Sequence, residues 1–279
     1  MEHLAKSILL SPQCKAGMDW LESHLPLLQK WHRFEYDQHF DRVAKWERLF
    51  SGVYPTFEAA RQAVPPAKTI GFDHPQTAAF LGLRTKLLPS DYPVMFWLRE
   101  LIGPTTRIFD FGGYTGISYR AYAPYLHFPD AMEWIVYDLP AVVAAGEQHQ
   151  REPSTAERHL KFTSRIEDGN GSDVFLAAGS LHYCKENLSE FIHRLSVRPR
   201  YLLLSKLPLC AGPSFVTLQN MGLAIAPYRR FNVDEFHREI EALGYHVLDQ
   251  WSNPDVACYI PFHPDHSVRE FTGMLLSLH

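Results

Sequence analysis

The chain has 279 residues, of which 46% are hydrophobic and 21% are charged, and its 27 Lys and Arg against 31 Asp and Glu give a net charge of −4. This composition is that of a folded globular protein and excludes disordered, collagen-like and coiled-coil chains. The weakly acidic balance, without a Lys- or Arg-rich run, argues against nucleic acid as a partner.

The longest apolar runs fall short of the roughly 18 residues that a membrane span requires, and the first residues lack the apolar core of a signal peptide. We therefore expect a cytoplasmic protein without a membrane partner. The four cysteines lie far apart, at Cys14, Cys184, Cys210 and Cys258, and none belongs to a CxxC or Cys/His pair. They predict reduced thiols and no metal site.

The first hundred residues have a helical pattern. Apolar and aromatic side chains recur at helical spacing over residues 15–50. The tryptophans that we expect in the core are Trp20, Trp31, Trp46 and Trp97. Residues 51–55 form a predicted turn, after which Thr56 is expected to cap a short helix over 57–64.

A further helix is predicted over 92–102, and no strand is expected before residue 105. Residues 1–104 are therefore assigned to a helical N-terminal region. We expect this region to form a substrate lid or the interface of a homodimer, and residues 105–279 to form a second domain.

From residue 105 onward, short apolar runs alternate with helical segments. The expected strands are 107–111, 133–138, 159–163, 173–178, 200–205, 245–251 and 256–261. The expected helices are 116–126, 140–150, 185–195 and 233–243. This alternation predicts an α/β sheet covered on both faces. The last two strands are joined by residues 252–255 alone, and so short a connection requires an antiparallel pair.

A glycine-rich turn follows the strand at 107–111. Asp110 precedes Gly112, Gly113 and Gly116, and a helix is predicted to open at Gly116. Glycines let the backbone turn sharply and approach a ligand, and ligands of open α/β sheets bind beyond the carboxyl ends of the strands. The adjacent glycines differ from the GxGxxG spacing of dinucleotide-binding loops. A turn with a purely structural role is the alternative.

An acidic residue, Asp138, ends the next strand. Its carboxylate can accept hydrogen bonds from both hydroxyls of an adenosyl ribose. The alternative is that Asp138 only caps the helix that opens at Pro140. Together with the glycine loop, Asp138 predicts an adenosyl cofactor.

The loop resembles motif I of the class I S-adenosylmethionine-dependent methyltransferases, in which an acidic residue precedes Gly-x-Gly-x-Gly. Tyr114 stands where that motif usually has its middle glycine. Between about residues 50 and 251 the chain also resembles a family of methyltransferases from bacterial surface-polysaccharide and other biosynthetic clusters. The matching segments are 51–54, 109–113, 137–140, 179–183, 215–220 and 244–245.

This resemblance implies a Rossmann-like sheet of seven strands with the last strand antiparallel, and S-adenosyl-L-methionine as the cofactor. Residues 105–279 would then be the catalytic domain. The expected cofactor-binding residues are Asp110, Gly112, Gly113, Tyr114, Thr115, Gly116, Asp138, Leu139, Ala178, Gly179 and Ser180.

The resemblance implies that the strand at 173–178 ends between the cofactor and its acceptor. His182 is the candidate base, because a neutral imidazole can take or steer the proton of a hydroxyl group. A histidine that only hydrogen-bonds the backbone is the alternative. Tyr183 is the candidate for orienting the acceptor.

The segment from 213 to 230 is predicted to be a long loop inserted between elements of the sheet, and such loops often carry specificity. The residues expected to bind substrate lie here: Thr217, Gln219, Asn220, Arg229 and Arg230. The first three offer neutral hydrogen-bonding groups, and the arginines could hold a carboxylate or phosphate. Ordinary loop polarity is the alternative for each.

These patterns predict a methyltransferase that acts on an oxygen of a small molecule, sugar or peptide in a biosynthetic pathway. An NAD-dependent oxidoreductase on a Rossmann fold is one alternative, and the loop spacing argues against it. A partner protein that keeps the fold without catalysis is another, and Tyr114 in the loop keeps that alternative open. The sequence does not name the methyl acceptor.

Overall fold

A computed structural model describes residues 26–43, 48–66, 68–74, 86–150, 157–222 and 224–279. The chain divides into two compact units, residues 1–44 and 45–279. In the first unit the described element is α3 (Pro26–Arg42). Trp31 on this helix is 53% exposed, so its predicted core position is wrong. Trp20 and Trp46 lie outside the described residues. No described helix is long and apolar enough to cross a membrane.

In the second unit, seven strands of the described residues form the larger sheet, in the spatial order β10-β11-β6-β5-β2-β3-β4. Their bounds are β2 (Arg107–Phe111), β3 (Glu133–Tyr137), β4 (Leu160–Thr163), β5 (Val174–Ala178), β6 (Tyr201–Leu207), β10 (Tyr245–Asn253) and β11 (Phe271–Leu278). Strands β2 to β6 are parallel, whereas β11 runs antiparallel to both of its neighbours, β6 and β10. The predicted fold class, a Rossmann-like sheet with an antiparallel last strand, is confirmed.

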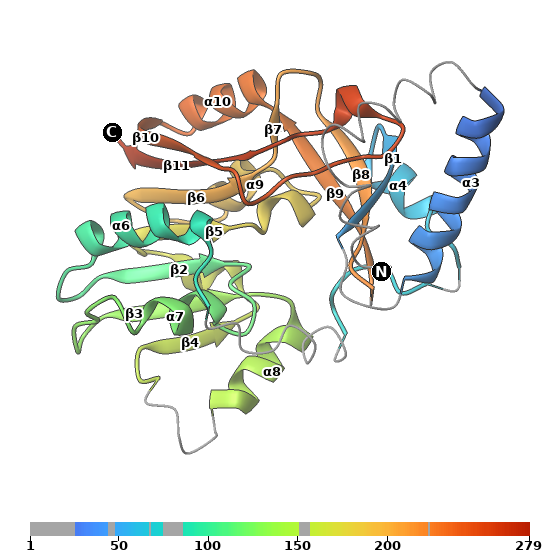
Figure 1. Ribbon diagram of the computed structural model, residues 1–279. Coiled ribbons are helices and arrows are strands. Elements are labelled where there is room, and N and C mark those ends of the chain that lie inside the picture. Colours follow the sequence, from blue (N-terminus) through green and yellow to red (C-terminus); the bar gives the residue numbers. More distant parts are fainter. Residues whose placement is uncertain (1–25, 44–47, 67, 75–85, 151–156, 223) are drawn as a thin grey trace. The chain divides into compact units, whose positions relative to one another are not determined.

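Helices cover both faces of this sheet (Figure 1). They are α6 (Tyr92–Leu101), α7 (Ile117–Tyr122), α8 (Pro140–Gln150), α9 (Leu188–His193) and α10 (Val233–Ala242). Side chains alternate between the faces along each strand. On β2, Ile108 packs with α6 and α7 on one face, while Phe109 and Phe111 pack with α9 and α10 on the other. The sheet therefore lies between two apolar layers, and its strand ends are left to form a site.

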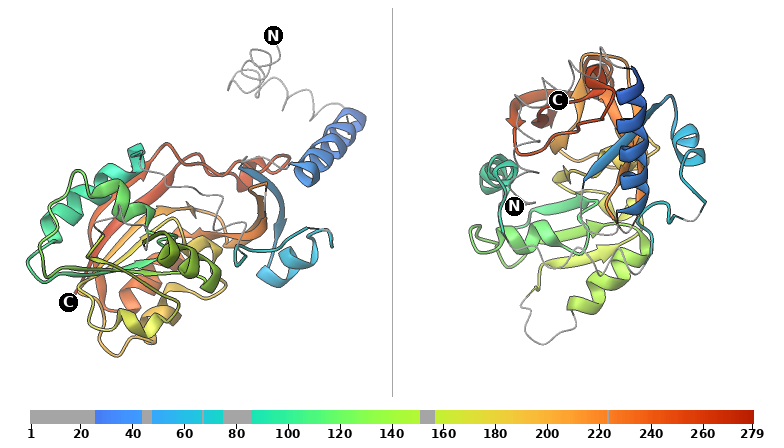
Figure 2. Two further views of the ribbon diagram at one scale, coloured as in Figure 1. Left: turned by 90° about the horizontal axis from the view of Figure 1, so that it is seen from below. Right: turned by 45° about the vertical axis from the view of Figure 1, so that its right-hand side comes forward.

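A second sheet of four described strands has the order β1-β8-β9-β7. It consists of β1 (Leu49–Tyr54), β7 (Leu209–Cys210), β8 (Phe215–Asn220) and β9 (Ile225–Asn232), and α4 (Phe57–Gln62) packs against it. The chain enters it directly from the carboxyl end of β6, and the sheet lies at that end of the larger one (Figures 1 and 2). Thr56 caps α4 as predicted, since its hydroxyl accepts the Ala59 N–H.

This second sheet corrects two expectations. The expected turn at 51–55 belongs largely to β1, so a strand does precede residue 105. The expected loop at 213–230 is the antiparallel hairpin of β8 and β9. All six residues of β8 are buried, so the strand lacks the alternation of polar and apolar residues that marks a half-exposed strand.

The final strand is also displaced from its predicted position. Residues 256–261 form no strand apart from a single bridge between Cys258 and Val268, and β11 begins at Phe271. The antiparallel pairing itself is confirmed, but residues 254–270 join the two strands instead of a tight turn. Pro254 precedes the expected strand and Pro261 is its last residue, and proline cannot donate to a sheet interior.

Candidate functional site

The glycine loop after β2 touches the end of β5. Gly112 has φ +68°, and its N–H donates to the Tyr137 carbonyl oxygen at 2.8 Å. A Cβ at Gly112 would overlap the side chain of Ser180. The Ser180 hydroxyl donates to the carbonyl oxygen of Phe111 at 2.5 Å. The structure thus joins two predicted cofactor segments, one from each strand end.

Tyr114 occupies the loop position at which the resembled motif has a glycine. Its backbone is left-handed, with φ +56°, which a side chain adopts at a cost of about 1–2 kcal/mol. The side chain is buried against Val142, with Ile117 and Ala145 beside it. Packing of the Tyr114 ring against α8 offsets the free-energy cost of the left-handed backbone. The ring is held at this helix.

Asp138 connects the end of β3 to this loop. Its two carboxylate oxygens accept the Tyr114 N–H and the Leu139 N–H, each at 2.8 Å. Burial raises the pKa of Asp138 to about 6, and the neighbouring Asp73 adds to the effect. In the first turn of α8, Asp73 accepts the Ala141 N–H at 3.1 Å. Asp138 is therefore not simply the cap of that helix.

Asp110 lies beneath the loop, fully enclosed. Its carboxylate accepts the Trp134 indole N–H at 2.9 Å, and a Cβ at Gly113 would overlap it. Burial raises the pKa of Asp110 to about 7. Gly113 must therefore be a glycine because Asp110 fills the space under it.

The remaining predicted cofactor residues extend the same edge. Gly116, with φ +83°, begins α7, and Thr115 is buried beside it with its carbonyl oxygen accepting from Arg120. Ala178 ends β5, and Gly179 follows it with φ +104°. Together with the exposed Leu139, the predicted set lies along the carboxyl ends of β2, β3 and β5.

His182 is buried in an aromatic cluster beyond β5, in the short turn η3 (Leu181–Tyr183). Its ring centroid lies 4.2 Å from that of Tyr228 and 4.4 Å from that of Tyr183. Its Nδ1 atom has no hydrogen-bond partner among the described residues. Burial lowers the pKa of His182 to about 3, with Arg48 and Lys206 contributing. The imidazole is therefore neutral and can accept a hydrogen bond.

Tyr183 connects this cluster to the second sheet. Its hydroxyl donates to Oε1 of Gln219 at 2.5 Å, and the ring of Phe72 meets its ring edge-on at 5.2 Å. Burial raises the pKa of Tyr183 well above its usual value, so the phenol keeps its proton. Tyr183 can orient a group by hydrogen bonding but does not supply a base.

The expected substrate residues are strand residues rather than loop residues. Thr217, Gln219 and Asn220 are buried in β8, and Thr217 donates to the Ser51 carbonyl oxygen of β1 at 3.2 Å. The structure brings Gln219 to Tyr183. Asn220 accepts the Gly222 N–H at 2.7 Å and thus shapes the turn before β9.

Neighbouring positions on β9 place Arg229 and Arg230 on opposite faces, so they do not form one anion site. Arg229 donates to Asn187 and to the Lys185 carbonyl oxygen, and its guanidinium lies 5.0 Å from the ring centre of Phe57. Arg230 is fully buried and donates to the carbonyl oxygens of Pro208 and His266.

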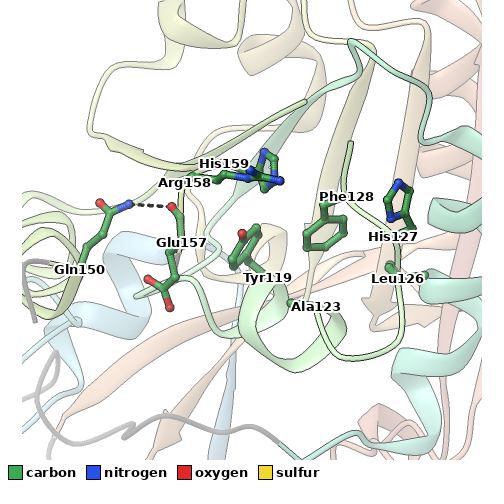
Figure 3. Close-up of a pocket in the computed structure, with 9 residues that line it drawn as sticks. All are labelled: Tyr119, Ala123, Leu126, His127, Phe128, Gln150, Glu157, Arg158 and His159. Carbon is green, nitrogen blue, oxygen red and sulfur yellow. Dashed lines mark hydrogen bonds between the residues drawn. The ribbon is translucent and has the colours of Figure 1, made fainter. Parts of the chain in front are cut away.

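Figure 3 shows a cavity of about 570 Å³ that contains none of the predicted site residues in its lining. It is lined by Tyr119, Ala123, Leu126, His127, Phe128, Gln150, Glu157, Arg158 and His159. His159 directly precedes β4, so the cavity reaches the amino end of that strand. None of its lining residues belongs to the glycine loop of residues 112–116.

Three charged residues near the site were not predicted from the sequence: Asp73, Asp91 and Lys206. Asp73 and Asp91 belong to segments before β2 that carry no motif, and only the fold brings them to the strand ends. Lys206 lies within a strand that reads as apolar. No local pattern could have identified them.

No family model and no curated protein matches the chain. Among solved structures, it resembles the 1,6-didemethyltoxoflavin-N1-methyltransferase of Burkholderia thailandensis, with 15% identity over 72% of this chain and 80% of that one, at a TM-score of 0.45. That protein was solved with 1,6-didemethyltoxoflavin and S-adenosylhomocysteine bound. An S-adenosylmethionine-dependent methyltransferase of Clostridium acetobutylicum is 11% identical over 72% of this chain and 93% of that one, with a TM-score of 0.45.

OxaC, solved with S-adenosylhomocysteine and oxaline, is 13% identical over 74% of this chain, with a TM-score of 0.48. The chain spans about half of OxaC, 52% of its length. At these scores the likenesses add no support of their own, and the fold assignment rests on the strand order and the antiparallel β11.

Proposed function

We propose that the protein is an S-adenosylmethionine-dependent methyltransferase that methylates an oxygen of a small molecule, sugar or peptide. One observation carries the proposal. At the carboxyl ends of two adjacent strands, the glycine loop is tied to the carboxylate of Asp138 through the Tyr114 N–H. Rossmann-like sites bind adenosyl ligands in this way, with a glycine loop whose backbone lies close to the ligand and a carboxylate that accepts hydrogen bonds from the ribose hydroxyls.

The residues present fit such a cofactor. Ser180 and Asp110 fill the space where side chains of residues 112 and 113 would lie, so both positions are glycines and the loop presents bare backbone, which a ligand can approach closely. Asp138 would accept hydrogen bonds from the ribose hydroxyls, with Leu139 beside it. The cofactor supplies a methyl group on a sulfonium, and the chain has to align the acceptor with it.

In this proposal His182 and Tyr183 orient the acceptor. The unpaired Nδ1 of His182 accepts the hydrogen bond of a hydroxyl group, and Tyr183 is held in place by Gln219. Thr217 and Asn220 form hydrogen bonds that fix the second sheet beside these two residues. Arg229 packs against Phe57 of α4 on the same sheet. We further propose that the enzyme acts in a cytoplasmic biosynthetic pathway and that residues 1–104 shape the acceptor site or a dimer interface.

Calorimetry with S-adenosylhomocysteine tests the cofactor site. We expect the wild type to bind it and Asp138→Ala to bind about tenfold or more weakly, because a charged hydrogen-bond acceptor is lost. Asp130→Ala is the matched control, since Asp130 is an exposed carboxylate that pairs with Arg158 away from the loop. Absence of binding by the wild type, or equal binding by Asp138→Ala, contradicts the proposal.

Two further measurements separate the alternatives. Titration with NADH followed by fluorescence tests a nucleotide oxidoreductase, for which we expect no saturable signal. Incubation with S-adenosylmethionine and hydroxyl-bearing acceptors, read by mass spectrometry, tests catalysis against a non-catalytic partner protein. A methylated product with S-adenosylhomocysteine formed in equal amount would exclude the latter.

A further inference from the structure

A β-bulge interrupts β6 close to its carboxyl end. Leu204 pairs with Met274 and Leu207 with Thr272, so Ser205 and Lys206 both stand opposite Gly273. Lys206 has φ +58°, a left-handed conformation in the interior of a strand. Bulges of this kind redirect a side chain, and they are frequent beside active sites.

The bulge directs Lys206 to a buried carboxylate. The Nζ atom of Lys206 lies 3.1 Å from Oδ1 of Asp91, and only 14% of the lysine side chain and 1% of the aspartate are exposed. Asp91, in the turn η1 (Pro89–Asp91), also accepts the Tyr122 hydroxyl at 3.2 Å and the Leu88 N–H at 2.8 Å. The fold therefore holds one positive and one negative charge in a fixed place.

This charge pair adjoins the candidate cofactor site. A Cβ at Gly179 would lie 3.3 Å from Cδ of Lys206. Tyr122, which donates to Asp91, has its ring 6.4 Å from that of Trp134, and Trp134 donates to the carboxylate under the glycine loop, Asp110. The Lys206 side chain thus packs against the turn after β5, and its partner Asp91 is linked through two aromatic rings to the base of the loop.

Stabilisation of the fold does not account for this arrangement. A buried ion pair often contributes no more than apolar residues of similar volume, because both charges lose their hydration. The left-handed backbone of Lys206 adds a further cost. Such costs at the carboxyl end of a central strand are characteristic of a ligand site.

We propose that Lys206 binds the amino-acid end of the methyl donor by contacting its α-carboxylate, and that Asp91 positions Lys206 for this contact. This inference rests on the proposed function. The α-carboxylate is the one anionic group of the donor, and an ammonium group held in a fixed place complements it, whereas Asp91 is too deeply buried to touch a ligand. Adenosine held at Asp138 would place that end of the molecule across the loop, toward β5 and β6.

Two ligands that differ only at this end test the inference by calorimetry. S-adenosylhomocysteine carries the amino-acid group, whereas 5′-methylthioadenosine has the same adenosine and thioether without it. We expect Lys206→Met to weaken binding of S-adenosylhomocysteine about 10- to 100-fold and to leave binding of 5′-methylthioadenosine within about twofold. Lys206→Arg should restore much of the loss. Lys161→Met is the control, because Lys161 pairs with Glu133 on the exposed edge strand.

The outcomes are distinct. If the wild type binds neither ligand, the proposed function fails and this inference fails with it. If the wild type binds S-adenosylhomocysteine and Lys206→Met binds it equally well, this inference alone is overturned. An equal loss for both ligands in Lys206→Met, or in the second variant Asp91→Asn, would assign the pair a purely structural role and would also overturn it.

Discussion

At the scale of one residue, Asp110 shows how the site lowers the stability of the folded protein. The carboxyl group is buried beneath the glycine loop with the Trp134 N–H as its donor, and burial raises its pKa to about 7. Because the unfolded value is near 3.8, the folded state disfavours ionisation. Asp110 therefore reduces the free energy of unfolding as the pH rises from about 4 through about 7.

Asp110→Asn should remove this pH-dependent loss while keeping an oxygen acceptor for Trp134. We expect the free energy of unfolding of the variant to exceed that of the wild type by an amount that grows between pH 4 and pH 7. This difference should reach on the order of 1–4 kcal/mol at pH 8. Urea unfolding at pH 5, 7 and 8 measures the difference. A difference that stays constant over this range would contradict the assignment.

His182 acts in the opposite direction. Its pKa is near 6.5 when unfolded and about 3 in the fold, so the unfolded chain binds a proton at mildly acidic pH that the folded chain does not. The wild type should therefore lose roughly 2 kcal/mol of stability between pH 8 and pH 5 through this residue. His182→Phe should abolish that part of the loss, measured by urea unfolding, and the exposed His127→Phe should not.

Single residues of the site were predictable where they belong to a local pattern. Asp110 lies near the end of a strand, and Gly112, Gly116 and Asp138 follow strands. These strands could be recognised from their apolar runs, so the proximity of the four residues follows from the parallel order. The roles of Lys206 and Asp91 could not be predicted, because 115 residues separate them and a bulge directs one toward the other. The opposite faces of Arg229 and Arg230 were also hidden while their segment was expected to be a loop.

At the scale of elements, the glycine loop and the turn after β5 are in direct contact. Gly112 combines a positive φ with a position against Ser180. Any side chain there forces the two strand ends apart. Since both ends carry proposed cofactor residues, the contact sets the width of the site.

Gly112→Ala should destabilise the fold by about 2–4 kcal/mol, from overpacking against Ser180 and from the left-handed backbone. Gly212→Ala is the matched control, because no atom lies within 4 Å of its Cβ position, and it should change stability by less than about 0.5 kcal/mol. Thermal or urea unfolding measures both.

The double variant Gly112→Ala with Ser180→Gly separates the two causes. It should recover the overpacking part and leave about 1 kcal/mol of backbone cost. No recovery in the double variant would show that the two strand ends do not touch as described.

The predicted elements succeeded where the chain is locally regular. The five parallel strands and the helix Pro140–Gln150 match the structure closely, because each is a compact apolar run or a helical pattern with a clear start. Strand β8 could not be recognised because it is covered on both faces. β11 was missed because the segment 256–261 is equally apolar and lies closer to β10 along the chain. The pairing of β11 with β6 joins residues 70 positions apart, such as Leu204 and Met274.

At the scale of the whole molecule, every described residue of the candidate site belongs to the unit of residues 45–279. Both sheets belong to the same unit. The role of residues 1–104 as a substrate lid or dimer interface stays a prediction. Two elements of this range, β1 and α6, are parts of the larger unit.

A chain limited to residues 45–279 should therefore fold and bind S-adenosylhomocysteine with an affinity within about twofold of the full chain. Circular dichroism during thermal unfolding should show one cooperative transition. Loss of binding by this chain, with the transition intact, would mean that residues 1–44 contribute to the cofactor site. Loss of the transition would mean that the larger unit depends on them to fold.

The place of β11 in the sheet has a consequence for synthesis on the ribosome. Strand β11, residues 271–278, lies between β6 and β10 and pairs with both. The edge that each of these strands presents to β11 is therefore unpaired until β11 is made. The nascent chain therefore carries an unpaired strand edge from the synthesis of β6 until that of β11, with a second one once β10 is made, and such edges attract other chains. Newly made protein should consequently depend on chaperones until β11 is released, and the sheet then closes in one late step.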